Sequence, residues 1–173
     1  MRTSTGIAPA AYVEHVLLDE RLAADLENTG ATGLSFHSVY AVMPDKRHIK
    51  LRWKQLSAAH TLPPMSPRTT GLPREQACEV CWRNGYGLTS KAPTRIVYRA
   101  SDLRQADDVN ASWENEWFAI LKPELRESLL SRPFMLVTPK VRRVFLAAGV
   151  TSFKWLPIRV EETEGASRGS EAG

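Results

Sequence analysis

The chain has little of several features that each define a class of protein. Among its 173 residues are only two cysteines, which cannot build the disulfide framework of a small secreted domain. No apolar run approaches the length needed to cross a bilayer, and residues 1–20 lack the compact apolar segment of a secretory signal. We therefore expect a cytoplasmic globular protein that has no membrane partner.

The bulk composition is that of an ordinary compact protein. Hydrophobic residues make up 43% and charged residues 24% of the sequence, close to the average for globular domains. A chain of this length buries roughly 70% of its unfolded surface, so it needs neither a disulfide nor a metal to stay folded. We expect one α+β domain over residues 1–162, followed by a disordered tail over residues 163–173, which contain no large apolar residue.

Positive charge is concentrated in two stretches of the sequence. The net charge of +4 arises from 23 basic and 19 acidic residues. Residues 41–60 hold five basic residues and one acidic residue, and residues 121–150 hold six basic and two acidic residues. These stretches would make one basic face only if the fold brings them together. Because the net charge is low, we favour solvated surfaces over a nucleic-acid partner.

Residues 1–60 have the pattern of a helix followed by a β-hairpin. Apolar residues recur at helical spacing over residues 11–26, which predicts an amphipathic helix. Alternation over residues 34–42 predicts a strand, and turn residues follow it. From Ile49 to Lys54 apolar and basic side chains alternate strictly, which predicts a second strand with one apolar and one basic face. The two strands are expected to pair as a hairpin.

A Pro-rich loop over residues 61–77 separates this part from residues 78–162. Four prolines and a glycine between residues 61 and 74 exclude a helix or a central strand there. Residues 78–162 begin with a Cys-x-x-Cys turn and continue as an α/β part. Their patterns predict strands at 94–98, 134–137 and 153–160, an acidic loop at 102–110, an apolar cluster at 113–121 and a helix at 123–130.

The clearest pattern is a strand, a helix and a strand over residues 134–160. Thr138 is a favourable N-cap, Pro139 suits the first helical position, and Gly149 ends the helix. We expect the strands on either side of this helix to lie parallel in one sheet. The predicted fold class is therefore α+β, with a mixed sheet of about five to six short strands and a few short helices.

The common signatures of catalysis are missing from the sequence. It contains no G-x-S-x-G, H-E-x-x-H, G-x-x-x-x-G-K-[ST] or G-x-G-x-x-G motif. Acidic residues at Asp107–Asp108 and at Glu114 and Glu116 are expected to be solvated, as acids in polar loops usually are. No Ser, Cys or Thr nucleophile stands at a spacing from a histidine that is typical of a catalytic pair. The four histidines are His15, His37, His48 and His60. We therefore expect no enzymatic activity.

Cys78 and Cys81 form the one constellation with a defined chemistry. Two thiolates in a C-x-x-C turn can hold one tetrahedral zinc ion at about 2.3 Å. A structural zinc site needs two further ligands, and neither His48 nor His60 stands at a typical zinc spacing. A redox pair follows a strand and opens a helix, whereas a Pro-rich loop precedes this pair. Plain thiols, metal ligands and a redox or disulfide pair remain open for these two residues.

Two segments carry a resemblance to a known family. The first is Gly71-Leu72-Pro73, which leads into Cys78-Glu79-Val80-Cys81. The second is the C-terminal run PFMLVTPKVRRVFLAAGVTSFKWLPIRVE. Together, over residues 71–162, these segments resemble the bacterial double-CXXCG immunity family. The resemblance implies a cytoplasmic antidote that binds and neutralises a cognate toxin.

The chain departs from the family pattern at the cysteine motif. Trp82 follows Cys81 where the family has glycine, and only one of the two cysteine pairs is present. Both departures weaken the case for a metal site, although Cys78 and Cys81 are retained as candidate metal ligands. Neutralisation itself requires a complementary surface and no catalytic group.

Aromatic and arginine side chains supply most of the binding energy at protein interfaces. The candidates for partner binding are therefore Trp53, Trp82, Arg142 and Arg143. The sequence leaves two interpretations from other classes open. One is a small zinc-containing module that binds nucleic acid, and the other is an enzyme whose motifs are not among the common ones.

Overall fold

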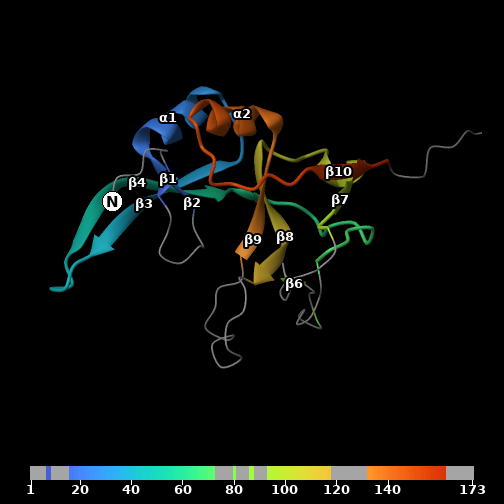
Figure 1. Cartoon of the computed structure of the whole chain (residues 1–173), viewed down its shortest axis with the longest axis horizontal. Helices are drawn as coiled ribbons and strands as arrows, with labels where there is room; N and C mark the ends of the chain where they lie inside the picture. The colour runs from blue at the N-terminus through green and yellow to red at the C-terminus, as the bar shows by residue number, and fades with distance from the viewer. Residues whose placement is uncertain are drawn as a thin grey trace, which may run out of the picture.

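The computed structural model describes residues 7–8, 16–72, 80, 86–87, 93–117 and 132–162. Strands predominate in these ranges and two short helices accompany them, so the predicted α+β class is confirmed. The strands are divided among three small sheets (Figure 1). No helix in the described ranges is long and apolar enough to span a membrane.

The first sheet is antiparallel and contains the predicted hairpin. Its strands are ordered β1-β2-β4-β3. The strands span Ile7–Ala8 (β1), Val16–Asp19 (β2), Leu34–Val42 (β3) and His48–Ala58 (β4). In the hairpin Phe36 lies opposite Leu56 and Tyr40 lies opposite Lys50, with an irregularity between Ser38 and Tyr40. The hairpin predicted over residues 34–54 is therefore confirmed.

The helix predicted over residues 11–26 is confirmed over residues 20–26 and wrong over residues 16–19, and residues 11–15 lie outside the described residues. Val16–Asp19 is strand β2, and helix α1 spans Glu20–Asn28. The change occurs at Asp19, whose side chain caps the helix by accepting a hydrogen bond from the Leu22 backbone N–H at 2.8 Å. An apolar triplet before such a cap fits a strand as well as a helix, and pairing with β4 selects the strand.

The second sheet contains both parallel and antiparallel pairs. β5 (His60–Thr61) and β6 (Tyr86–Gly87) each lie parallel to β8 (Val109–Trp117). β9 (Arg132–Val137) lies antiparallel to β8. The third sheet is a single parallel pair, β7 (Ile96–Arg99) with β10 (Ile158–Glu161).

The parallel pairing predicted around the second helix is therefore wrong. Helix α2 spans Pro139–Ala147 as expected, but β9 and β10 belong to different sheets. The reason lies in residues 150–157, which pack against α2 and form no strand. The rings of Phe153 and Trp155 lie 5.5 and 6.0 Å from that of Phe145. The chain regains strand geometry only at Ile158, beside β7.

The Pro-rich segment is part of the folded core. Leu62 and Met65 are buried together with Ile96, Tyr98 and Leu136. Thr70 exchanges backbone hydrogen bonds with Arg95, at 3.0 and 2.9 Å. Over its described residues 62–72 the predicted loop forms no helix or named strand, as expected, but this segment covers apolar side chains of the core. A short 3-10 helix, η1 (Ala100–Leu103), follows β7 and replaces the first part of the predicted acidic loop.

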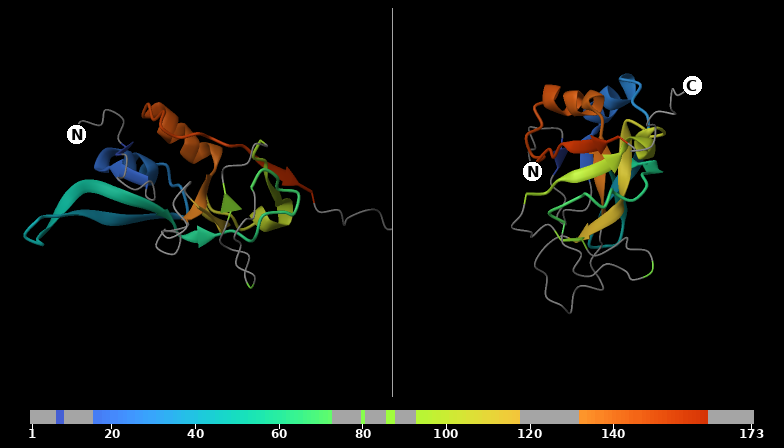
Figure 2. Two further views of the ribbon diagram at one scale, coloured as in Figure 1. Left: turned by 60° about the horizontal axis from the view of Figure 1, so that its bottom comes forward. Right: turned by 90° about the vertical axis from the view of Figure 1, so that its right-hand side faces the viewer.

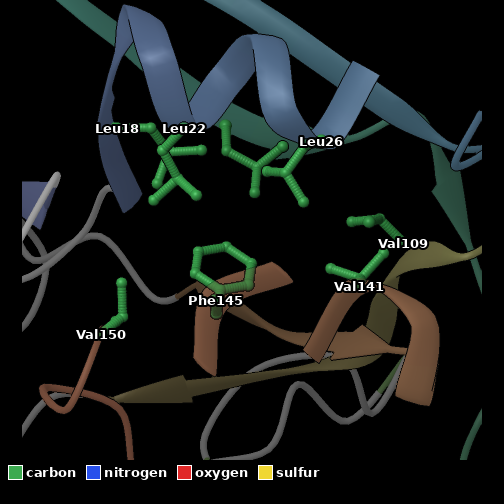
Figure 3. Close-up of a cluster of buried hydrophobic side chains, with 8 residues drawn as sticks. Leu18, Leu22, Leu26, Val109, Val141, Phe145 and Val150 are labelled. Atoms are coloured by element: carbon green, nitrogen blue, oxygen red, sulfur yellow. The ribbon is translucent and has the colours of Figure 1, made fainter. Parts of the chain in front are cut away.

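The larger core lies between the helices and the first two sheets. Figure 3 shows Leu22 and Leu26 of α1 pointing towards Val141 and Phe145 of α2. The remaining buried members are Leu18, Leu56, Val109 and Val150. This cluster joins elements that are far apart in the sequence, which explains why the helices lie side by side over one end of the first sheet (Figure 1).

Several predicted features lie outside the described residues. They are the cysteine turn with Cys78, Cys81 and Trp82, the helix at 123–130, and residues 163–173. Glu161, close to the predicted end of the domain, is the last residue of β10. Its carboxylate accepts a hydrogen bond from the Ser66 hydroxyl at 2.5 Å and pairs with Arg68 at 3.3 Å. The last strand is thereby tied to the Pro-rich segment.

Candidate interaction surface

The β3–β4 hairpin extends well beyond the part of the sheet that the helices cover (Figure 2). We call residues 40–52 the distal hairpin. Strand β2 pairs with β4 only from Trp53 to Leu56. Within the described residues, the strand segments of the distal hairpin therefore pair only with each other. Such a two-stranded ribbon is exposed on both faces.

The register divides the side chains of the distal hairpin between two faces. Tyr40 lies opposite Lys50 and Val42 lies opposite His48, so these side chains share one face. Because successive side chains in a strand alternate, Arg52 lies on this face as well. Ala41 lies opposite Ile49, and Leu51 follows on the same side. The predicted division of β4 into a basic and an apolar face is thus confirmed, with Tyr40 and Val42 added to the basic face.

Large apolar side chains are exposed on both faces. On the basic face Val42 is 67% and Tyr40 is 52% exposed, and on the apolar face Ile49 is 46% and Leu51 is 36% exposed. Single exposed apolar side chains are ordinary in a soluble protein. Four of them within one hairpin, two on each face, are an unusual concentration of exposed apolar side chains, of the kind found where other proteins bind.

The tip of the distal hairpin is closed by its own hydrogen bonds. The Met43 N–H donates to the Arg47 carbonyl and the Lys46 N–H donates to the Met43 carbonyl, each at 2.9 Å. The Asp45 carboxylate pairs with the Arg47 guanidinium at 2.5 Å. This contact neutralises the acidic residue of the tip, so the net positive charge comes from Lys46, Lys50 and Arg52.

The predicted partner-binding residues lie in different places. Trp53 is half-buried where the distal hairpin joins the covered part of the sheet, opposite Asp19. Arg142 and Arg143 are exposed on α2, and the Arg142 guanidinium lies 5.8 Å from the Trp155 ring, a cation–π distance. In Figures 1 and 2 α2 lies in the helix layer, away from the tip of the hairpin. The described part of the second basic stretch therefore does not join the first.

Asp108, predicted to be solvated, instead connects three elements. Its carboxylate accepts hydrogen bonds from the Thr138 hydroxyl at 2.6 Å, Lys140 Nζ at 2.9 Å and the Thr32 N–H at 3.1 Å. The hydrogen bond from Thr138, followed by that from Lys140, lowers the pKa of Asp108 from 3.8 to about 2. Lys140 also donates to the Gly30 carbonyl at 2.9 Å. This contact set holds the start of β3, the start of β8 and the N-terminus of α2 together.

Glu114, also predicted to be solvated, is buried in the second sheet. One of its carboxylate oxygens accepts a hydrogen bond from the Met65 N–H at 2.7 Å. Burial, followed by the nearby charge of Glu114, raises the pKa of the Tyr98 hydroxyl. Tyr98 is fully buried among apolar residues, so these groups belong to the interior. Nothing is described of the Glu116 side chain.

The described residues also contain one open depression and three histidines, which we considered as binding or metal sites. An open depression of about 390 Å³ is lined by Thr70, Pro93, Thr94, Arg95, Pro157 and Arg159. Nowhere in the described ranges do three His, Cys, Asp or Glu side chains gather closely enough to hold a metal ion. His48 and His60 lie at opposite ends of the β4–β5 segment, and His37 shares a 2.8 Å hydrogen bond with the Ser57 hydroxyl.

Comparisons with protein-family models, curated proteins and solved structures find no match to this chain.

Proposed function

We propose that this chain is a cytoplasmic immunity protein that binds a cognate bacterial toxin and neutralises it by covering part of its surface. The resemblance over residues 71–162 supports this role. The observation that carries the proposal is the distal hairpin, with Tyr40, Val42, Ile49 and Leu51 exposed beside basic side chains. In this role the chain catalyses no reaction, because occlusion requires only a complementary surface.

The physical properties of the distal hairpin suit an antidote. Removing apolar side chains from water provides binding energy, about 25 cal/mol per Å² of buried surface before the costs of association. A concentrated positive charge accelerates encounter with an oppositely charged partner. Lys46, Lys50 and Arg52 are exposed and provide that charge on the projecting hairpin (Figure 2).

A nucleic-acid-binding module with a zinc site is the second candidate. It is favoured by one observation, since a two-stranded β-ribbon fits the major groove of DNA and the distal hairpin is such a ribbon with basic side chains. The exposed aliphatic side chains on its apolar face have no counterpart in a phosphate backbone. The immunity role therefore accounts for more of the hairpin surface.

The gene neighbourhood tests the proposed function, which predicts that a gene beside this one encodes a toxic domain. When expressed, that domain should kill cells that lack the chain and spare cells that produce it. Survival that does not depend on the chain would contradict the proposal. Metal analysis addresses the second candidate: stoichiometric zinc in protein purified without chelator, lost in Cys78→Ser, together with salt-dependent binding to generic DNA, would favour it.

A further inference from the structure

We infer that the distal hairpin inserts into an acidic cleft of the toxin, so that both of its faces contact the partner. This inference rests on the proposed function and specifies the surface and the mode of binding. It concerns residues 40–52, which project from the covered end of the sheet (Figures 1 and 2).

The distribution of exposed apolar side chains favours insertion over docking on a flat surface. Tyr40 and Val42 lie on one face of the ribbon, and Ile49 and Leu51 lie on the other. A flat partner can cover only one face of a two-stranded ribbon. A cleft covers both, so it removes all four side chains from water.

The charges identify the chemistry of that cleft. Lys50 and Arg52 are exposed on the same face as Tyr40 and Val42, and Lys46 is exposed at the tip. The carboxylate of Asp45 is already paired with Arg47. Inserting this segment into a cleft without acidic side chains would bury cations with no counter-charge, which is costly. The cleft therefore carries Asp or Glu side chains facing the basic face.

The same geometry favours a protein over a nucleic acid as the binding partner of the hairpin. The apolar face presents Ala41, Ile49 and Leu51, none of which can contact a phosphate. A nucleic acid would leave these side chains in water or beside charged groups. A protein cleft with an acidic wall and an apolar wall matches both faces.

The distal hairpin is held in shape before it binds. Two backbone hydrogen bonds and the Asp45–Arg47 pair close its tip. At its other end, Phe36 and Leu56 anchor the two strands in the core. A segment ordered in advance loses little conformational entropy on binding, which favours high affinity.

Face-specific variants test insertion directly. Ile49→Thr changes the apolar face and Val42→Thr changes the basic face, while threonine keeps the preference for strand geometry. Val160→Thr is the matched control, because Val160 is 57% exposed on β10, away from the hairpin. Affinity for the purified toxin domain is measured by calorimetry, and circular dichroism verifies folding. We expect both hairpin variants to weaken binding at least tenfold and the control to leave it within twofold.

If only one of the two hairpin variants binds the toxin domain more weakly, only one face contacts the partner. That result would overturn insertion and leave the proposed function intact. Unchanged affinity in both variants would overturn the hairpin as the binding surface. If the unaltered chain does not bind the toxin domain, both the proposed function and the insertion of the hairpin are wrong.

Charge reversal tests the acidic cleft. Lys50→Glu with Arg52→Glu should slow association with the toxin domain at least tenfold in 50 mM salt, and by much less in 500 mM salt. Arg104→Glu with Lys154→Glu is the control, since both residues are exposed away from the hairpin. Equal effects of the two double variants would overturn an acidic cleft. Tighter binding of the unaltered chain to a 20-base-pair DNA duplex than to the toxin, lost on Lys50→Glu with Arg52→Glu, would overturn the choice of a protein partner.

Discussion

The two ends of the β3–β4 hairpin have the same strand geometry but opposite surroundings. At the covered end Leu56 is 2% exposed and Phe36 packs against the larger core. At the distal end, six and seven residues along the same strands, Val42 is 67% and Ile49 is 46% exposed. The difference is set by other parts of the chain, because α1, β2 and α2 cover only one end.

This contrast assigns different tasks to the two ends. The covered end contributes to the free energy of unfolding, since its apolar side chains are buried there. Under the proposed function, the distal end contributes little to folding and keeps its apolar side chains available for the toxin. The division can be tested by changes at each end of the hairpin and in the contacts that hold the covered end.

The largest difference is expected between Leu56→Ala and Leu51→Ala. Leu56→Ala leaves a cavity in the core and should lower the free energy of unfolding by about 3 kcal/mol. Leu51→Ala, on the exposed apolar face, should change it by less than about 1 kcal/mol. Urea denaturation followed by tryptophan fluorescence measures both values. Similar losses in the two variants would show that the distal end is also part of the folded core.

A second comparison concerns the two glycines that precede β3. Both have positive φ, 63° at Gly30 and 74° at Gly33. A Cβ at Gly33 would meet the Val109 carbonyl oxygen and lie 2.5 Å from the Asp107 Cβ, whereas a Cβ at Gly30 would meet nothing within 4 Å. Gly33→Ala should therefore lower the free energy of unfolding by about 3 kcal/mol, from strain plus overpacking.

Gly30→Ala is the control, because it adds only the backbone strain, about 1 kcal/mol. Thermal and urea denaturation of the two variants provide the comparison. Equal stabilities would mean that β3 does not need its close approach to β8, and that the covered end is less tightly defined than its contacts indicate.

Asp108 should make the covered end sensitive to acid. Its pKa is about 2 in the folded chain against an ordinary 3.8, so its contribution is complete above about pH 4 and is lost as the pH falls towards 2. Solvent screening of the Lys140 pair reduces that contribution, which we expect to be about 1 kcal/mol. Asp108→Asn should remove it, so the stability difference from the unaltered chain should shrink between pH 5 and pH 2. A difference independent of pH would contradict this role.

Much of the local structure could be predicted from the sequence, because local rules decide it. Alternation from Ile49 to Lys54 identified β4 and its two faces, and Thr138-Pro139 identified the start of α2. Thr138 is the N-cap by position, although its hydroxyl donates to Asp108 instead of capping the helix. The sequence pattern therefore identified the correct first residue of α2, but the expected side-chain cap is not what Thr138 provides.

What could not be predicted depends on contacts between distant residues. Asp108 is bound by Thr32, Thr138 and Lys140, which no spacing rule connects. Residues 153–157 have the sequence pattern of a strand, but Phe153 and Trp155 pack against Phe145 of α2 and the segment forms no strand. Strand alternation reveals two faces but not whether another element covers them, so it could not identify the distal hairpin as exposed.

The most local effect is expected at the tip of the distal hairpin. Lys46 has φ 64°, a left-handed conformation that asparagine tolerates and β-branched threonine does not. Lys46→Asn and Lys46→Thr both remove the charge, so they differ in backbone preference alone. We expect the Thr variant to be less stable at the tip by about 1 kcal/mol, with faster hydrogen exchange at the Met43 and Lys46 amides, whose N–H groups close the turn. If the distal end opens independently of the core, exchange at buried Leu56 should be the same in both variants. A parallel change at Leu56 would show that the two ends unfold as one unit, and the division between a folding end and a binding end would then be wrong.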